Sequence, residues 1–291
     1  MSVQPSPRSS SLSQRVISSL VLIPILVLPV YWSVWLSVGL VLIFMWLGLR
    51  ELFDALAQAG YHPRPLMGFS VGALFCVAAA IPVPLPIDAG LAALWISLLL
   101  SLISELPRKD REGSLYGWGL TFAGACYFGG LVSSYISIRR IDAPPLDAGW
   151  LAFLHIPPGA AWIFTVFAIT WLQDTAAFFV GRAYGRHQMA PYLSPKKSWE
   201  GATGGFVVAV LTSLVAVPIL GLPISYPAAA VIGAAGGIFG PLGDLVESLI
   251  KRQIGIKDIG STIPGHGGVL DRADSMVFVG PTLYLLIRLF I

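Results

Sequence analysis

Charged side chains are scarce in this sequence. Of its 291 residues, 11% are charged and 56% are hydrophobic, and the mean hydropathy is +0.78. A soluble domain usually carries about 25% charged residues, so this chain has too few to coat a water-soluble surface. The scarcity excludes an ordinary cytosolic enzyme, a disordered chain and a nucleic-acid-binding protein that relies on a basic surface. The net charge of +3 is too small to indicate a partner.

Cysteine is scarce as well. The chain has 2 cysteines, Cys76 and Cys126, and both lie in apolar runs. This placement argues against a disulfide framework and against a thiolate metal site.

Long apolar runs dominate the chain, and a helix needs roughly 20 apolar residues to cross a bilayer. We therefore expect an all-α, polytopic integral membrane protein with about nine transmembrane helices. The run 16–49 is long enough for two spans joined near residues 29–33, and the run 201–243 for two more that turn near residues 221–225. Further spans are expected at 65–87, 89–104, 113–138, 159–180 and 275–291.

The placement of Lys and Arg predicts the orientation, because these residues collect in cytoplasmic loops. With nine spans and a cytoplasmic N-terminus, 15 of the 18 basic residues fall on the inside. Arg139 and Arg140 fall outside, and Arg288 lies in the last span. We expect a multi-pass protein of the cell's inner (plasma) membrane. Residues 1–15, rich in Ser and free of acids, read as a cytoplasmic tail, and the alternative is the stub of a transit peptide.

Two pairs of acids flank the last long polar loop. Asp244 and Glu247 end the eighth span, and Asp271 and Asp274 begin the ninth. Residues three apart share a helix face, and carboxylates at a membrane boundary are costly unless they are used. Two such pairs suit Mg²⁺, which binds one or two carboxylates plus substrate phosphates. The alternative is that these acids cap the helix and pair with nearby Lys or Arg.

Bases and glycines accompany these acids. The loop holds Lys251, Arg252, Lys257, His266 and Arg272, and this mixture indicates bound phosphates. The segment 264–268, which contains Gly267 and Gly268, has a backbone able to form an anion nest. A second polar loop carries Lys196, Lys197 and Ser198 before a helix whose N-terminus would attract phosphate. Asp174 lies inside the sixth span, with Arg182 as a candidate partner.

Residues 248–274 read SLIKRQIGIKDIGSTIPGHGGVLDRAD. This segment resembles the signature of the phosphatidate cytidylyltransferases (CDP-diglyceride synthetases), and every charged position matches. Ala273 departs from it, because the family usually has a larger apolar residue there. The segments GDLVES, SPKKSWEG and QDTAAF also look like family motifs. The resemblance covers mainly residues 173–274, while the first five spans are similar only in hydrophobicity and number.

The resemblance implies transfer of the cytidylyl group of CTP to phosphatidic acid, giving CDP-diacylglycerol and pyrophosphate. It implies a cytoplasm-facing catalytic region at 159–291, which follows the N-terminal transmembrane helices at 16–158 in the sequence. Asp244 and Asp271 would bind Mg²⁺, with Glu247 and Asp274 as supporting ligands. The resemblance also implies a bound K⁺ and a homodimer, although no residue pattern in this sequence indicates either one. The catalytic residues would be Asp244, Asp271, Asp274, Lys251, Lys257 and Arg272; substrate would be bound by Lys196, Lys197, Ser198, Arg252, His266, Gly267, Gly268 and Asp174.

Two other functions compete with this one. A CTP-dependent lipid-alcohol kinase, such as a dolichol or phytol kinase, would release CDP, but it lacks the complete signature. An ion-coupled transporter would place its acids near the bilayer midplane, often in repeated halves. Here the acids gather at one interface together with Lys and Arg, which favours the transferase.

Overall fold

The computed structural model describes residues 12–81, 88–107, 113–142, 149–260, 262–263 and 267–291. Its first half consists of α1 (Leu12–Trp32), α2 (Val34–Gln58), α3 (Pro65–Ala80), α4 (Ala89–Ile103), α5 (Ser114–Gly124), a π-helical segment (Ala125–Gly130) and α6 (Ser134–Arg139). The second half consists of a 3₁₀ turn (Ala152–Leu154), α7 (Pro158–Tyr184), β1 (Gln188–Ala190), β2 (Ser194–Ser198), α8 (Trp199–Leu220), α9 (Tyr226–Gln253) and α10 (Leu270–Phe290).

The predicted breaks between paired spans are confirmed, and each has a local cause. Ser33 adopts an extended backbone and its side chain accepts a hydrogen bond from the Trp35 N–H, so α1 ends and α2 begins there. Gly221, at φ +68°, ends α8 in the left-handed conformation that glycine favours. Ser225 then caps α9, whose first turn contains a proline. The two long runs therefore fold as two helices each.

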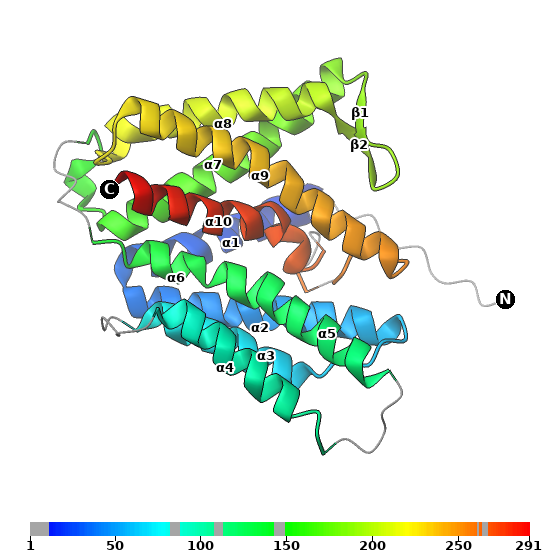
Figure 1. Cartoon of the computed structure of the whole chain (residues 1–291). Helices are drawn as coiled ribbons and strands as arrows, with labels where there is room; N and C mark the ends of the chain where they lie inside the picture. The colour runs from blue at the N-terminus through cyan, green and yellow to red at the C-terminus, as the bar shows by residue number, and fades with distance from the viewer. Residues whose placement is uncertain (1–11, 82–87, 108–112, 143–148, 261, 264–266) are drawn as a thin grey trace.

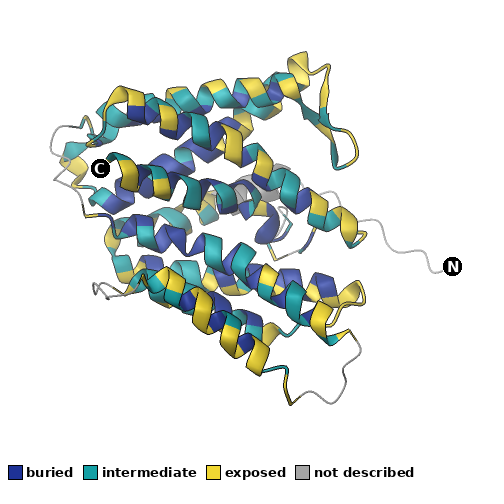
Figure 2. Ribbon diagram, viewed as in Figure 1, coloured by how far each residue is buried: buried dark blue, intermediate teal, exposed yellow. Residues whose placement is uncertain are grey.

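Six helical segments in the described part of the chain are long and apolar enough to cross a membrane: α2, the segment Ser114–Arg139, α7, α8, α9 and α10. Three further apolar helices are shorter, namely Leu20–Trp32 within α1, α3 and α4. All nine lie where the sequence predicts spans. Much of α4 is exposed (Figure 2). Its exposed residues include the large apolar Trp95, Leu99 and Leu100. Such a surface suits lipid.

Helix α10 joins the two halves of the molecule. It packs against α9 and α7 on one side and against α6 and α2 on the other (Figure 1). Its C-terminal residues Val279, Leu283 and Ile287 belong to a core shared with α7 and α8. Its N-terminal residues Leu270 and Val277 belong to a second core shared with α2. α10 as a whole is therefore packed against both halves of the chain.

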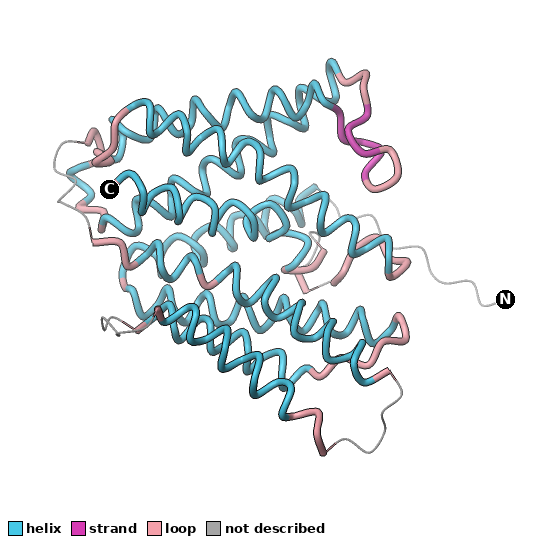
Figure 3. Tube along the Cα trace, viewed as in Figure 1, coloured by secondary structure: helices cyan, strands magenta, loops and turns pink. Residues whose placement is uncertain are grey.

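The predicted all-α class is confirmed, with one short exception in the described part of the chain. β1 and β2 pair as an antiparallel hairpin between α7 and α8 (Figure 3). The base of the hairpin is stabilised by the Glu200 carboxylate, which accepts hydrogen bonds from the backbone N–H groups of Arg186 and His187. Glu200 Oε1 also lies 2.6 Å from Nδ1 of His187. These polar contacts give a short loop an ordered shape that a hydrophobic pattern does not predict.

Arg139 and Arg140, the two basic residues expected outside, bind helix ends. The Arg139 Nε donates a 2.7 Å hydrogen bond to the Val30 carbonyl near the end of α1. Arg140 donates through Nη1 to the Ala80 carbonyl at the end of α3. Carbonyls at helix C-termini have no partner within the helix, and cations are favourable there. The position of the two arginines is thus explained by these helix ends, whichever side of the membrane they lie on.

Candidate functional site

The last turns of α9 carry polar side chains on one side of the helix. α9 continues as a helix to Gln253, so residues three and four apart in this segment lie above one another. Ser248 Oγ lies 3.3 Å from Asp244 Oδ1, and Lys251 Nζ lies 2.9 Å from Glu247 Oε1. Glu247 is fully buried. Asp244 and Glu247 therefore lie on the same side of α9, as their spacing predicts.

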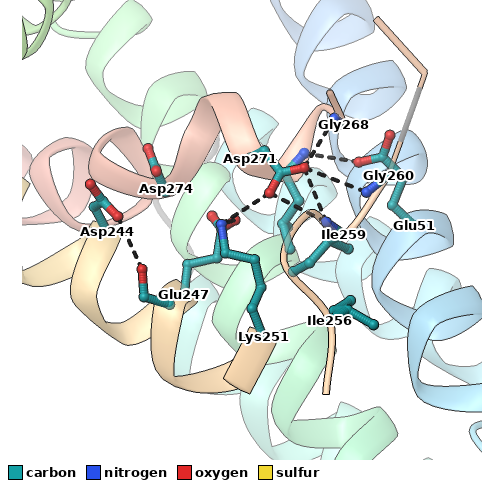
Figure 4. Close-up of polar contacts among 12 residues, drawn as sticks. Glu51, Asp244, Glu247, Lys251, Ile256, Ile259, Gly260, Gly268, Asp271 and Asp274 are labelled. Atoms are coloured by element: carbon teal, nitrogen blue, oxygen red, sulfur yellow. Dashed lines mark hydrogen bonds and ion pairs between the residues drawn. The ribbon is translucent and has the colours of Figure 1, made fainter. Parts of the chain in front are cut away.

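Lys251 connects α9 to α10. Its Nζ also lies 3.0 Å from Asp271 Oδ1, so one ammonium group contacts two carboxylates (Figure 4). The side chains of Lys251, Glu247 and Asp271 are 13%, 0% and 5% exposed. Ion pairs this deeply buried are stable only when all partners are present. The two acid pairs predicted around the loop are thereby joined through a lysine.

Asp271 organises the loop that precedes α10. Its carboxylate accepts backbone N–H groups from Ile259 at 3.1 Å, Gly260 at 3.4 Å and Gly268 at 3.1 Å (Figure 4). Gly267 has a φ of +84°, a conformation that favours glycine. The sequence favoured phosphate as the partner of the N–H groups of this segment, including that of Gly268. Its N–H donates to Asp271 instead.

The hairpin brings a second lysine to the acids of α9. Lys197 Nζ lies 2.6 Å from Asp244 Oδ2 and 3.3 Å from the Pro241 carbonyl. Ser198, the residue after it, caps α8 by accepting a 3.1 Å hydrogen bond from the Gly201 N–H. β2 therefore brings Lys197 to the C-terminal half of α9.

A cavity of about 630 Å³ lies between these elements. Its polar lining contains eight predicted site residues: Asp174, Lys196, Lys197, Ser198, Asp244, Asp271, Arg272 and Asp274. Another part of its wall is apolar and includes Leu22, Ile23 and Leu26 of α1, Phe44 of α2, and Trp171 and Phe178 of α7. One hollow thus combines a charged region with a surface suited to hydrocarbon.

Asp174 faces this cavity and is accessible within it. Its Oδ1 lies 3.5 Å from the Ser275 hydroxyl of α10, so its neighbour in the described residues is Ser275 rather than Arg182. Asp274 accepts the Ser275 N–H at 2.7 Å and lines the same cavity. Four carboxylates, one from α7, one from α9 and two from α10, therefore line one cavity.

Some predicted residues lie elsewhere. Lys257 and Arg252 are exposed, and Arg252 donates to the carbonyls of Leu193 and Ile256. Of the described residues, neither these two nor Lys251 and Glu247 line the cavity. His266 lies outside the described residues.

The carboxylates do not form a ready metal cage. Among the described residues, no three His, Cys, Asp or Glu side chains are grouped closely enough to hold a metal ion by themselves. Lysine ammonium groups lie against Asp244 and Asp271 instead. The donors are nevertheless hard oxygens, and Mg²⁺ usually takes one or two carboxylates and completes its shell with water and phosphate. The donor set therefore fits Mg²⁺ bound together with a phosphorylated substrate.

Two buried polar residues escaped the sequence analysis. Glu51 of α2 is 7% exposed and accepts the Leu270 N–H at 3.0 Å. Gln173, beside Asp174, is fully buried, and no described residue bonds its side-chain amide. The sequence signal for Glu51 was its position, because this acid follows Arg50 at the end of a charge-free run and lies on the buried face of its helix.

Comparisons with known proteins identify a family for this chain. The profile of the cytidylyltransferase family matches residues 13–290. The chain is 38% identical over 198 residues to the phosphatidate cytidylyltransferase of Bacillus subtilis, covering 68% of each chain. It is 43% identical over 205 residues to that of a Staphylococcus epidermidis strain, covering 66% of this chain and 78% of the relative. It is 37% identical over 211 residues to phosphatidate cytidylyltransferase 5, chloroplastic, of Arabidopsis thaliana, covering 68% of this chain and 50% of the relative.

Proposed function

The chain belongs to the cytidylyltransferase family, and we propose that it transfers the cytidylyl group of CTP to phosphatidic acid, giving CDP-diacylglycerol and pyrophosphate. The observation that carries this proposal is the cavity of about 630 Å³, which is charged on one side and apolar on the other. A triphosphate needs cations, and a diacyl lipid needs an apolar wall beside its phosphate. Both substrates can meet in this one space.

Positioning is the main task of the protein in this reaction. The phosphate of phosphatidic acid is already largely ionised at neutral pH, so it attacks the α-phosphorus of CTP without a general base. Lys196, Lys197 and Arg272 line the cavity and bind the phosphate oxygens of the two substrates. Holding nucleophile and phosphorus in line converts a bimolecular encounter into a local step.

Asp244, Asp271 and Asp274 would hold Mg²⁺, because all three line the cavity. When bound, the ion neutralises phosphate charge on the triphosphate and in the transition state. Glu247 is fully buried and holds Lys251, so we assign it to that lysine rather than to the metal. Lys251 in turn fixes the orientation of Asp271.

We place this site at the cytoplasmic face of the inner membrane, in a chain of nine spans with its N-terminus inside. The hairpin, the end of α9 and the start of α10 lie at one end of the helices, and the C-terminus lies at the other (Figure 1). CTP is available from the cytosol, while the acyl chains remain in the bilayer against α1 and α7. A homodimer is a further proposal, which cross-linking in the membrane tests.

Topology is tested with a membrane-impermeant maleimide on vesicles of known orientation. We expect Lys257→Cys, beside the site, to be labelled in inside-out vesicles, and Tyr226→Cys, at the start of α9, in right-side-out vesicles. Both positions are exposed, while Cys76 is buried and Cys126 is half-buried. The opposite pattern would reverse the orientation.

The activity is tested with purified protein, CTP labelled in its α-phosphate, phosphatidic acid and Mg²⁺. We expect labelled CDP-diacylglycerol together with pyrophosphate. Asp244→Asn should remove most of the activity, because this carboxylate both lines the cavity and holds Lys197. Release of CDP with a phosphorylated lipid alcohol would identify a kinase instead. Full turnover in both Asp244→Asn and Asp271→Asn would refute the assigned metal site.

A further inference from the structure

Glu51 is a buried acid that contacts the catalytic half of the chain from the N-terminal half. It lies on α2 with 7% exposure, among apolar neighbours such as Leu52 and Phe53. Its Oε2 accepts the N–H of Leu270, the first residue of α10, at 3.0 Å. The first N–H groups of a helix have no partner within the helix, and a negative charge is favourable there. Glu51 therefore holds the first turn of α10 from outside.

The same carboxyl group lies against two glycines of the loop before α10. A Cβ added to Gly260 would lie 2.4 Å from Glu51 Cδ and 2.5 Å from its Oε1. A Cβ added to Gly268 would lie 2.6 Å from Oε2. These distances are shorter than real contacts of a Cβ atom, so both positions require glycine while Glu51 stays in place. The loop is packed directly onto this side chain (Figure 4).

Gly260 and Gly268 are also the residues whose N–H groups bind Asp271. One glycine-containing loop is thus held between two carboxylates, Glu51 on one side and Asp271 on the other. Asp271 immediately follows Leu270, the residue that Glu51 binds. A displacement of the Glu51 carboxylate must therefore move the backbone donors and the helix turn that together fix Asp271.

We propose that Glu51 is a positioning residue for the cytidylyl transfer, acting through Gly260, Gly268 and Leu270 on the orientation of Asp271. The proposal rests on the proposed function, because Asp271 is assigned to the site by it. It gives α2, which lies outside the signature segment, a defined part in building the site.

The test compares Glu51→Ala with Leu49→Ala in purified protein. Leu49 is fully buried on the same helix, and its Cδ1 lies beside Gly72 of α3. Residues two apart on a helix do not share a face, so Leu49 and Glu51 point in different directions. We expect Glu51→Ala to lower kcat about a hundredfold, as a misplacement near 1 Å does, with little change in the KM for CTP. Leu49→Ala should lower the melting temperature and keep the kcat of the folded protein. Glu51→Gln retains an acceptor and should stay within about tenfold of the wild-type kcat, since a neutral hydrogen bond is roughly half as strong as a charged one.

Gly260→Ala supplies a test that does not depend on truncating Glu51. The three atoms nearest to the added Cβ all belong to Glu51, so this substitution displaces the carboxylate while leaving it in the protein. We expect a fall in kcat similar to that of Glu51→Ala, and a double variant no worse than either single variant. If Glu51→Ala does not accumulate, Gly260→Ala and Glu51→Gln carry the test.

Failure of the proposed function and failure of the role of Glu51 give different results. A wild-type protein that forms no CDP-diacylglycerol would overturn the proposed function itself. An active wild type with equal kcat in Glu51→Ala and Leu49→Ala would overturn the role of Glu51. Additive losses in the Glu51→Ala, Gly260→Ala double variant would also overturn it, because independent sites add and coupled sites do not.

Discussion

Replacing Lys251 by methionine removes the ammonium group that joins α9 to α10. Its Nζ lies 2.9 Å from Glu247 Oε1 and 3.0 Å from Asp271 Oδ1, and both carboxylates are almost completely buried. Methionine has a similar length and fills the same space, so the change deletes a charge and creates little cavity. Two buried carboxylates are left without their shared cation.

The expected loss follows from the burial of these groups. Removing one partner of a buried ion pair costs about 3–5 kcal/mol, because the other charge remains uncompensated. Asp271 keeps its backbone donors from Ile259, Gly260 and Gly268, so we expect the lower end, about 3 kcal/mol. At about 2 °C per kcal/mol for a chain of this size, the melting temperature should fall by roughly 6 °C.

The chain provides its own reporter of unfolding. Cys76 is fully buried in the core formed around α2, so a thiol-reactive dye gains access to it only when that core opens. Dye fluorescence on heating therefore measures the melting temperature in detergent. Adding Glu247→Gln to Lys251→Met removes one of the uncompensated charges and should recover part of the loss, about 1 kcal/mol or more.

Lys257→Met is the matched control, because Lys257 is an exposed lysine in the following loop. It should leave the melting temperature unchanged to within about 1 °C, as surface substitutions usually do. Equal melting temperatures for Lys251→Met and Lys257→Met would refute the buried network. So would a Glu247→Gln, Lys251→Met double variant less stable than Lys251→Met alone.

Three further predictions test the cavity, the loop and the hairpin. Lys196→Ala with Lys197→Ala should raise the KM for CTP by about tenfold or more, since each charged hydrogen bond is worth about 1.5–3 kcal/mol; an unchanged KM would refute their contact with the triphosphate. Gly267→Ala forces a side chain to φ +84° and costs about 1–2 kcal/mol. It should lower activity more than Gly255→Ala, at φ +74° in open space, and equal effects would remove Gly267 from the site. Glu200→Gln weakens the fastening of the hairpin and should raise the KM for CTP with little change in melting temperature; a normal KM would show that the hairpin is held otherwise.

Sequence reasoning located the helices well because the apolar runs are long and their breaks are local. Ser33 and Gly221 end helices through their own backbone conformations and caps, which neighbouring residues specify. The cavity residues of the hairpin, α9 and α10 were also found, because their charges stand out in an apolar chain. Helix breaks and isolated charges are both local signals, because each lies within a few residues of the feature that it predicts.

The remaining features depend on contacts between distant segments. Glu51 and Leu270 are 219 residues apart, and no spacing rule connects them. The β1–β2 hairpin contains proline and lysine rather than an alternating apolar pattern, and its base depends on the side chain of Glu200. Lys251 was assigned to the site from the charges of its loop and from the family resemblance, and the fold places it between two acids. Charge predicts that a lysine has an anionic partner without specifying which one.

The glycines of the signature segment show how one residue type can have two physical explanations. A glycine-rich loop beside bases is typical of a phosphate nest, and the sequence favoured that interpretation. In the structure, Gly260 and Gly268 donate their N–H groups to Asp271, and their missing side chains make room for Glu51. The anion bound by this backbone is thus a carboxylate of the protein itself. Lys196, Lys197 and Arg272 line the cavity and are the residues proposed here to bind phosphate, while the two glycines hold the carboxylate of Asp271.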